Sequence, residues 1–382
     1  MSYTIIATTF KGLEQILADE LFQLGATDVQ VINRAVSFTG DDSLLYASNI
    51  HLRTALRILK PILHFDFNDD KSYYENIYAF PWENYFNVEQ TFAIDFVVYS
   101  EMFRNTQFAA LRMKDAIVDR FRDVIKSRPS IDIKSPQIKF NLHINENHVN
   151  ISLDSSGEPL FKRGYRNSQH EAPLNEVLAA GMILISGWDK RTGFFDPMCG
   201  TGTLPIEAAL IAYNIAPGLI RKEYAFKNWP DYNRILYRQL LLDANAAIQT
   251  TKVFIDGSDL EKKYIMAARE NAMHALVDDK INFFIKPFDI CDPPPSSSMI
   301  IMNPPYGQRI GASGITDFYN MIGNTMKSKY AGKIIWLLTS NVEAMKSIGL
   351  KPSVKLPLYN GALECRFLKF EMYSGSKKAI KN

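Results

Sequence analysis

The rear part of the chain contains short apolar segments that each end in a polar or glycine-rich turn, with helical patterns between several of them. From about residue 175, these segments are 192–196, 253–259, 281–289, 298–303 and 332–340. Their length and their β-branched and aromatic content are typical of buried strands, and their alternation with helices predicts a doubly wound parallel sheet. Strand patterns at 353–359 and 362–373 flank Asn360-Gly361, a strong hairpin signal. We therefore predict an α/β sheet that ends in an antiparallel hairpin.

The front part mixes strands and helices without regular alternation, which indicates small α+β units. Strand patterns lie at 3–10, 29–40, 90–100 and 138–154, the last of which is a hairpin that turns near 145–147. Helical patterns lie at 13–25, 43–60 and 108–128. The polar, basic segment 155–173 marks a boundary. We predict three units, which are 1–60, 61–160 and 161–382, with an insertion at 214–245 in the third.

Composition excludes several classes of protein. The chain has 382 residues, 47% hydrophobic and 22% charged, which predicts a globular rather than a disordered protein. No apolar run reaches the roughly 18 residues of a membrane span, and the N-terminus lacks the pattern of a secretory signal. Cys199, Cys291 and Cys365 are far apart and form no metal-binding spacing. These features predict a cytoplasmic protein with no membrane partner.

Charge is unevenly distributed along the chain. Residues 1–160 hold 15 Lys/Arg against 21 Asp/Glu, whereas residues 161–382 hold 28 against 20. Within the acidic half, residues 104–139 are basic, with nine Lys/Arg against four Asp/Glu. Such a stripe is suited to a phosphate backbone, although a solvated helix face is the commoner explanation. Charge alone therefore does not distinguish a nucleic-acid-binding stripe from a solvated helix face.

Residues 196–210 read DPMCGTGTLPIEAAL, which places a glycine-rich turn between a strand and a helix. Gly200 and Gly202 would let the backbone approach a ligand closely, and the helix N-terminus would present N–H groups to it. No Gly-Lys-Ser/Thr follows, so a Walker-type phosphate loop is excluded. The turn suits a ligand with a carboxylate and an amine better than a triphosphate.

Two later strand patterns end in Asp259 and Asp289. An acidic residue at the tip of the second strand can hold both ribose hydroxyls, and Asp259 can also cap the helix predicted at 260–272. The spacing from Asp196 to Asp259 exceeds the usual ~20 residues, and the insertion at 214–245 explains the difference. For Asp289 we weigh two roles, as acceptor for an adenine amino group or as the cap of a turn.

The strand pattern 298–303 ends in Asn303, which Pro304, Pro305 and Tyr306 follow. Proline lacks the N–H that a central strand needs, so the strand should end near Asn303. In a parallel sheet this end faces the ligand crevice, where Asn303 and Tyr306 would lie at the mouth of a site. The alternative is an ordinary turn, since Asn and Pro are common there.

Taken in series, these strand ends resemble the class I S-adenosylmethionine (SAM)-dependent methyltransferases, which have a Rossmann-like sheet. The Asn-Pro-Pro-Tyr tetrad resembles that of the branch that methylates exocyclic amino groups of nucleobases. The resemblance implies SAM as cofactor, with Asp196, Gly200 and Gly202 at its methionine part, Asp259 at its ribose and Asp289 at its adenine. The full set of implied cofactor-binding residues is Pro173, Leu174, Asp196, Pro197, Cys199, Gly200, Thr201, Gly202, Asp259, Leu260 and Asp289.

The resemblance gives the tetrad a catalytic role. An exocyclic amine is a poor nucleophile because its lone pair is delocalised into the base. If the Asn303 side-chain oxygen and the Pro304 carbonyl each accept one N–H, the lone pair points at the methyl group. Pro305 would stiffen this turn, and Tyr306 would stack on a base swung out of its helix. No metal and no covalent enzyme intermediate are needed.

The front part resembles a ferredoxin-like domain followed by a THUMP RNA-binding domain. The order of motifs resembles the RlmL-type 23S ribosomal RNA guanine-N2 methyltransferases, a family often labelled N6-adenine-specific DNA methylase. The matching segments are 160–166, 172–180, 196–210, 216–221, 257–272, 303–310 and 359–367. The resemblance implies methylation of guanine N2 in large-subunit ribosomal RNA. Some members continue into a second methyltransferase domain, whose activity is not carried over to this chain.

Several alternatives stay open from the sequence. The same catalytic site would serve an N6-adenine DNA methyltransferase, although the chain shows no module that reads duplex DNA. A non-catalytic RNA-binding factor is a third class. Cys199 is interpreted as a packed thiol rather than a nucleophile, and the aromatic residues at 224–232 as core rather than an RNA platform. The candidate RNA-contacting residues are Lys114, Lys162, Arg163 and Arg166.

Overall fold

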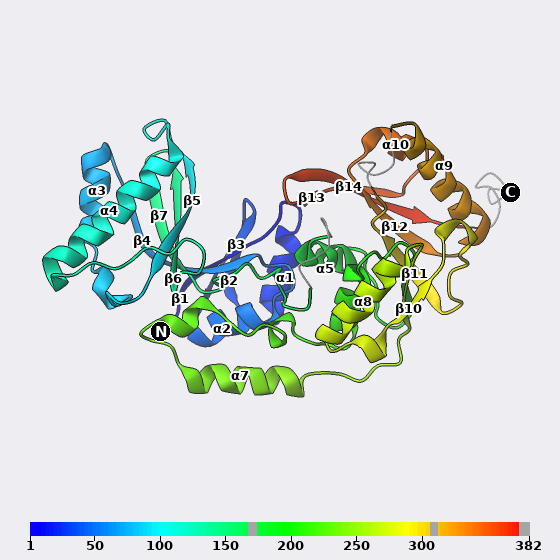
Figure 1. Cartoon of the computed structure of the whole chain (residues 1–382), viewed down its shortest axis with the longest axis horizontal. Helices are drawn as coiled ribbons and strands as arrows, with labels where there is room; N and C mark the ends of the chain where they lie inside the picture. Colours follow the sequence, from blue (N-terminus) through cyan, green and yellow to red (C-terminus); the bar gives the residue numbers. More distant parts are fainter. Residues whose placement is uncertain (167–173, 306–311, 374–382) are drawn as a thin grey trace.

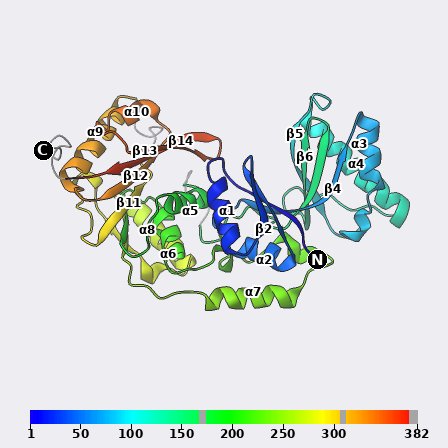
Figure 2. The same cartoon turned by 180° about the vertical axis from the view of Figure 1, so that it is seen from behind.

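A computed structural model describes residues 1–166, 174–305 and 312–373. Two seven-stranded sheets organise these residues, one in the front part of the chain and one in the rear part. Figures 1 and 2 show three regions in a row. The lobe of β5–β7, α3 and α4 lies at one end, the region of β1–β3, α1 and α2 lies in the middle, and the rear sheet lies at the other end.

The front sheet has the strand order β2-β3-β1-β4-β7-β6-β5. Its strands are β1 (Tyr3–Thr8), β2 (Thr27–Ile32), β3 (Ala35–Gly40), β4 (Arg57–Asp66), β5 (Phe92–Tyr99), β6 (Ile138–Asn145) and β7 (His148–Asp154). Its helices are α1 (Glu14–Gln23), α2 (Asp42–His51), α3 (Asp70–Ala79) and α4 (Thr106–Ile125). The predicted hairpin is confirmed, because Asn145 pairs with His148 across an antiparallel ladder.

The helix predicted at 43–60 is wrong in its second half. Helix α2 ends at His51, and strand β4 begins at Arg57. Pro61 restrains only the residue before it toward extended backbone and lies at a shift in the β4–β7 register, so it accounts for the end of the pattern but not for residues 52–59. Strand β4 pairs with β1 on one side and β7 on the other, so one continuous sheet crosses the position where we divided units 1–60 and 61–160.

The rear sheet has the order β10-β9-β8-β11-β12-β14-β13, which confirms the predicted doubly wound sheet with its antiparallel hairpin. Its strands are β8 (Gly193–Asp196), β9 (Ile255–Asp259), β10 (Asn282–Ile285), β11 (Ser297–Met302), β12 (Ile334–Thr339), β13 (Val354–Asn360) and β14 (Leu363–Glu371). Its helices are α5 (Glu176–Ile185), α6 (Thr203–Ala212), α8 (Lys262–His274), α9 (Ala312–Lys329) and α10 (Val342–Lys346). The order reverses between β8 and β11, and ligands bind such sheets at the carboxyl ends beside this point.

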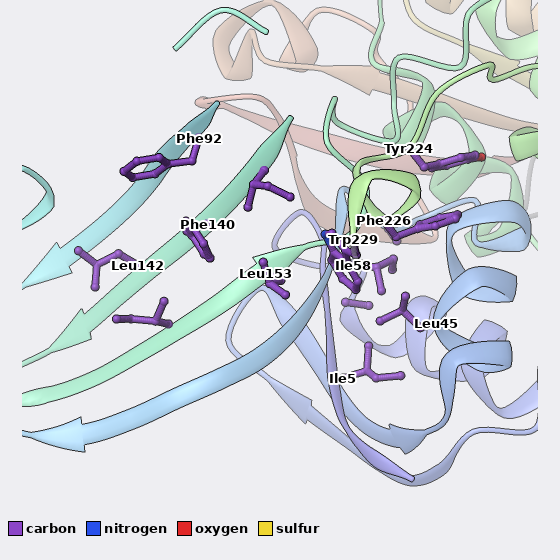
Figure 3. Packing of buried hydrophobic residues seen from close by; sticks show 14 of the residues in the cluster. Ile5, Leu45, Ile58, Phe92, Phe140, Leu142, Leu153, Tyr224, Phe226 and Trp229 are labelled. Atoms are coloured by element: carbon purple, nitrogen blue, oxygen red, sulfur yellow. The ribbon is translucent and has the colours of Figure 1, made fainter. Parts of the chain in front are cut away.

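The inserted segment crosses from the rear sheet to the front sheet. It carries helix α7 (Arg234–Ala246), which contacts α2 (Figure 1). Phe226 is buried and stacks on Tyr46 of α2, with ring centroids 4.4 Å apart, and on Tyr224 at 5.2 Å. Figure 3 shows Phe226, Tyr224 and Trp229 beside Ile58 and Leu45 of the front core. These aromatic side chains are therefore core, as predicted, but they belong to the core of the front sheet.

One hydrogen bond in this contact yields a stability prediction. The Tyr46 hydroxyl accepts the backbone N–H of Asn233, at 3.1 Å, where α7 begins. We expect Tyr46→Phe to lower the free energy of unfolding by about 1 kcal/mol, because that N–H loses its partner. The measurement is urea unfolding. Tyr78→Phe is the control, since the Tyr78 hydroxyl bonds to Asp123 at an exposed site and its loss should cost less than about 0.5 kcal/mol.

Candidate active site at the carboxyl edge of the rear sheet

The glycine-rich turn joins β8 to α6. Strand β8 ends at Asp196, whose side chain is 2% exposed and accepts the backbone N–H of Met198 at 3.1 Å. Burial raises the pKa of this carboxyl well above its usual range, and the nearby Asp259 carboxylate adds to the shift. A buried carboxylate beside a second one is electrostatically unfavourable in isolation. A cationic ligand would relieve that cost.

The two glycines of the turn have different tasks. Gly200 has φ +53° and Gly202 has φ +84°, both in the left-handed region that favours glycine. A Cβ on Gly202 would lie 2.9 Å from the Ala268 Cβ, so this glycine permits close packing of α6 on α8. A Cβ on Gly200 would meet no atom within 4 Å, so the turn is open on the side that Gly200 faces.

The end of β9 is tied to this turn. One carboxylate oxygen of Asp259 accepts the backbone N–H of Gly200, and the other accepts that of Glu261, each at 3.0 Å. The Cys199 N–H also donates to the Ser258 carbonyl at 2.9 Å. Burial raises the pKa of Asp259, although these backbone bonds oppose the shift. The predicted cap of the following helix is only partly right, because Glu261 is the N-cap of α8.

The remaining predicted cofactor residues divide into buried and exposed groups. Pro197 and Thr201 are buried, and their carbonyls accept the Ser258 hydroxyl and the Asn271 side-chain amide. Leu260 is exposed. Asp289 is also exposed and lies in the turn Phe288–Ile290 rather than at the end of β10, which stops at Ile285. The prediction that Asp289 ends a strand is therefore wrong.

The proline-rich segment follows the neighbouring strand. Strand β11 ends at Met302, as predicted, because Pro304 and Pro305 cannot donate to the ladder. Asn303 is half-buried, Pro304 is buried and Pro305 is exposed. Since β11 pairs with β8, Asn303 and Asp196 leave adjacent strands at the same edge. The predicted residues Tyr306 and Pro173 lie outside the described residues, whereas Leu174 is buried before α5.

Cys199 is a packed thiol. Its side chain is buried against the rear core, and its sulfur lies 3.8 Å from the Gly200 carbonyl oxygen. Burial raises the pKa of this thiol well above its usual range, so it is protonated at neutral pH. A nucleophilic role, which the sequence left as the weaker interpretation, is not supported.

The structure contradicts the prediction that Arg163 contacts RNA. Its side chain is 2% exposed, its guanidinium donates to the Leu160 and Arg53 carbonyls, and its Nε lies 3.5 Å from Glu207 Oε1. A side chain enclosed in this way cannot contact RNA phosphate. Buried acids such as Glu207 escaped the sequence analysis, because an acid inside an apolar helix pattern gives no signal of its buried partner.

The other three basic candidates differ in environment. Lys162 is 58% exposed and pairs with Glu158, and Lys114 lies on α4 with its amine 2.6 Å from Asp115. Arg166 is only 20% exposed and its guanidinium contacts protein groups. The environments of Lys162 and Lys114 allow contact with RNA, whereas the Arg166 guanidinium is occupied by hydrogen bonds and an ion pair within the protein.

The described residues hold neither a cluster of metal-ligating side chains nor a membrane-spanning helix. No cluster of three or more His, Cys, Asp or Glu side chains suited to a metal ion occurs in residues 1–166, 174–305 or 312–373. None of the helices described there is long and apolar enough to cross a membrane.

Sequence comparison now identifies the family of this site. A family model described as the RMKL-like methyltransferase domain matches residues 163–369, which is more than half of the chain. The chain belongs to this methyltransferase family. A model of the RlmL ferredoxin-like domain matches residues 4–59, and a THUMP model matches residues 68–154. The resemblance to RlmL-type enzymes and the predicted fold class are thereby confirmed for this RMKL-like methyltransferase.

Similar proteins support the assignment. A Synechocystis protein named "Putative RNA methyltransferase slr0064" is 38% identical, and the match covers 96% of both chains. The "Ribosomal RNA large subunit methyltransferase K/L" of Syntrophotalea carbinolica is 39% identical over 96% of this chain, but this chain spans only 53% of that relative. The crystal structure of SMU.472, "a putative methyltransferase complexed with SAH", superposes with a TM-score of 0.86 at 29% identity, covering 98% and 99% of the two chains.

Proposed function

We propose that this RMKL-like methyltransferase transfers a methyl group from SAM to the exocyclic N2 of a guanine in large-subunit ribosomal RNA. One observation carries the proposal. The glycine-rich turn, Asp259 and Asn303 lie at the carboxyl ends of β8, β9 and β11, which are adjacent strands at the switch point of the sheet. Relatives named as large-subunit ribosomal RNA methyltransferases supply the RNA class.

The residues at the first two strand ends fit SAM. Its sulfonium and ammonium groups are cationic, and a cation would favour the charged forms of Asp196 and Asp259, whose pKa values burial raises. Both oxygens of Asp259 already accept backbone N–H groups, so the carboxylate is held in place for ribose hydroxyls. The open space at Gly200 leaves room for the methionine part. Asp289 would serve the adenine from an exposed turn.

Asn303 and Pro304 would position the target amine. SAM supplies an electrophilic methyl group. The Asn303 side-chain oxygen and the Pro304 carbonyl would each accept one N–H of the guanine amine and so orient its lone pair. As the N–C bond forms, the S–C bond breaks and one amine proton is released to solvent. Tyr306 would stack on the flipped base.

The front units would deliver the RNA. We propose the division into 1–60, 61–160 and 161–382, with 214–245 inserted, in which the first two units share one sheet. The second unit corresponds to the THUMP match, and Lys114 lies on its helix α4. Lys114 and Lys162 are the basic candidates whose exposure allows contact with RNA phosphate.

The test is to identify the methylated nucleoside. The protein receives labelled SAM together with total RNA, or genomic DNA, from a strain that lacks this gene, and the nucleic acid is then digested. We expect N2-methylguanosine in large-subunit RNA. N6-methyladenine in DNA would contradict the RNA assignment but would agree with the proposed roles of the catalytic residues. Label in neither pool would contradict the proposal for free RNA.

A further inference from the structure

Arg166 lies in the segment that precedes α5, and its guanidinium joins two helices of the rear sheet. Its Nη2 donates to the Leu174 carbonyl and to the Thr203 hydroxyl, each at 2.9 Å. Its Nε lies 3.2 Å from a carboxylate oxygen of Glu176. Thr203 is the first residue of α6, directly after Gly202, and Glu176 is the first residue of α5. Arg166 therefore links the starts of both helices.

The electrostatics of this corner are unusual. Helix N-termini carry partial positive charge, so a guanidinium placed beside two of them is unfavourable unless an anion is close. Glu176 supplies one negative charge, but it is buried, and burial raises its pKa to about 7. No side chain caps the start of α6, where Gly202 is the N-cap. A ligand carboxylate at the glycine-rich turn would add a second negative charge beside the Arg166 guanidinium and the start of α6.

We propose that Arg166 is a positioning residue for the cofactor: it holds the starts of α5 and α6 in register so that their N-termini receive the carboxylate of SAM. The inference rests on the proposed function, because it assumes that SAM lies against the glycine-rich turn. Arg166 acts through Thr203 and Leu174 and has no role in RNA binding. This assignment replaces the phosphate contact that we predicted for Arg166 from its place in a basic segment.

The test compares cofactor affinity with RNA affinity. Calorimetry gives the Kd of S-adenosylhomocysteine (SAH), and filter binding gives the Kd of large-subunit RNA. We expect Arg166→Ala to raise the SAH Kd about tenfold, the effect of losing a charged, multiply bonded group, and to change the RNA Kd less than about twofold. Arg166→Lys should raise the SAH Kd only about threefold, because one amine keeps the charge but cannot reproduce the planar fork. Lys162→Ala, in the same segment, should leave the SAH Kd unchanged.

Kinetics separate positioning from general damage. If N2-methylguanosine formation is measured, Arg166→Ala should raise the KM for SAM about tenfold while kcat at saturating SAM falls less than about threefold. Thr203→Val removes one of the two hydrogen bonds and should raise the SAH Kd about threefold. If Arg166→Ala does not fold, the SAH Kd of Thr203→Val tests the positioning role instead.

The outcomes are distinct. An unchanged SAH Kd in Arg166→Ala and Thr203→Val overturns the inference, and a loss of RNA affinity in Arg166→Ala would restore the phosphate interpretation. Failure of the unaltered protein to bind SAH would instead reject the proposed function itself.

Discussion

Asn303→Ala is expected to lower kcat for methyl transfer by at least about 100-fold while the Kd of SAH stays within about twofold. Removing one preorganised hydrogen-bonding group from an enzyme site typically costs 10²- to 10³-fold in kcat. Asn303 leaves β11 next to β8, and Pro304 fixes the backbone that follows it. Alanine removes the side-chain acceptor and leaves the Pro304 carbonyl in place, so the amine would be held at one N–H only.

The measurement pairs single-turnover kinetics with SAH calorimetry. Asn341→Ala is a matched control, since Asn341 follows the neighbouring strand β12 and its side chain accepts the Ala344 N–H at 2.9 Å to cap α10. It should cost about 1 kcal/mol of stability and leave kcat unchanged. Near-normal turnover in Asn303→Ala would reject the proposed catalytic role. A loss of SAH affinity as large as the loss of kcat would place Asn303 in cofactor binding.

Arg163→Met is expected to lower the free energy of unfolding by about 3–5 kcal/mol, because it leaves the Glu207 carboxylate buried without its counterion. Glu207 is 0% exposed on α6; its Oε1 forms an ion pair with Arg163 and accepts the Tyr165 hydroxyl at 3.1 Å. Arg163 also donates to the Arg53 carbonyl, which belongs to the front part of the chain. The pair therefore connects the helix after the glycine-rich turn to the front sheet.

A double-mutant cycle measures this coupling. We expect Glu207→Leu to lower the free energy of unfolding by a similar amount. The double variant, Arg163→Met with Glu207→Leu, should lose less free energy than the two single variants added together. The difference, which is the coupling energy, should be about 2 kcal/mol or more. Lys162→Met is the control, since its exposed pair with Glu158 should contribute less than about 1 kcal/mol. Additive effects in the cycle would show that the two charges do not depend on each other.

The sequence predicted the rear sheet well, because each strand there is a short apolar run with a clear end. Proline ended β11 at Met302, and Asn360-Gly361 placed the last hairpin. The same reasoning failed at 43–60. There the helical pattern of α2 runs into β4, and only the pairing of β4 with β1 and β7 fixes its strand conformation. Partners distant in sequence decided that element.

Within the candidate site, sequence patterns predicted that Asp196, Gly200, Gly202 and Asp259 would lie together, because residues at consecutive strand ends meet at one edge of a parallel sheet. The hydrogen bond from Gly200 to Asp259 brings together residues 59 apart in sequence. Asp289 was misplaced, since β10 ends four residues earlier than its apolar pattern suggests.

The sequence by itself determined the fold class, the family and the order of chemical groups along the strand ends, since these depend on local periodicity and motif spacing. Only the tertiary structure decided the environments of Lys162, Arg163 and Arg166 in the basic segment 155–173. Arg163 is enclosed beside Glu207, Arg166 joins the starts of α5 and α6, and Lys162 faces solvent. These three residues look alike in sequence. Their roles differ because burial and charge partners are set by helices packed from distant parts of the chain.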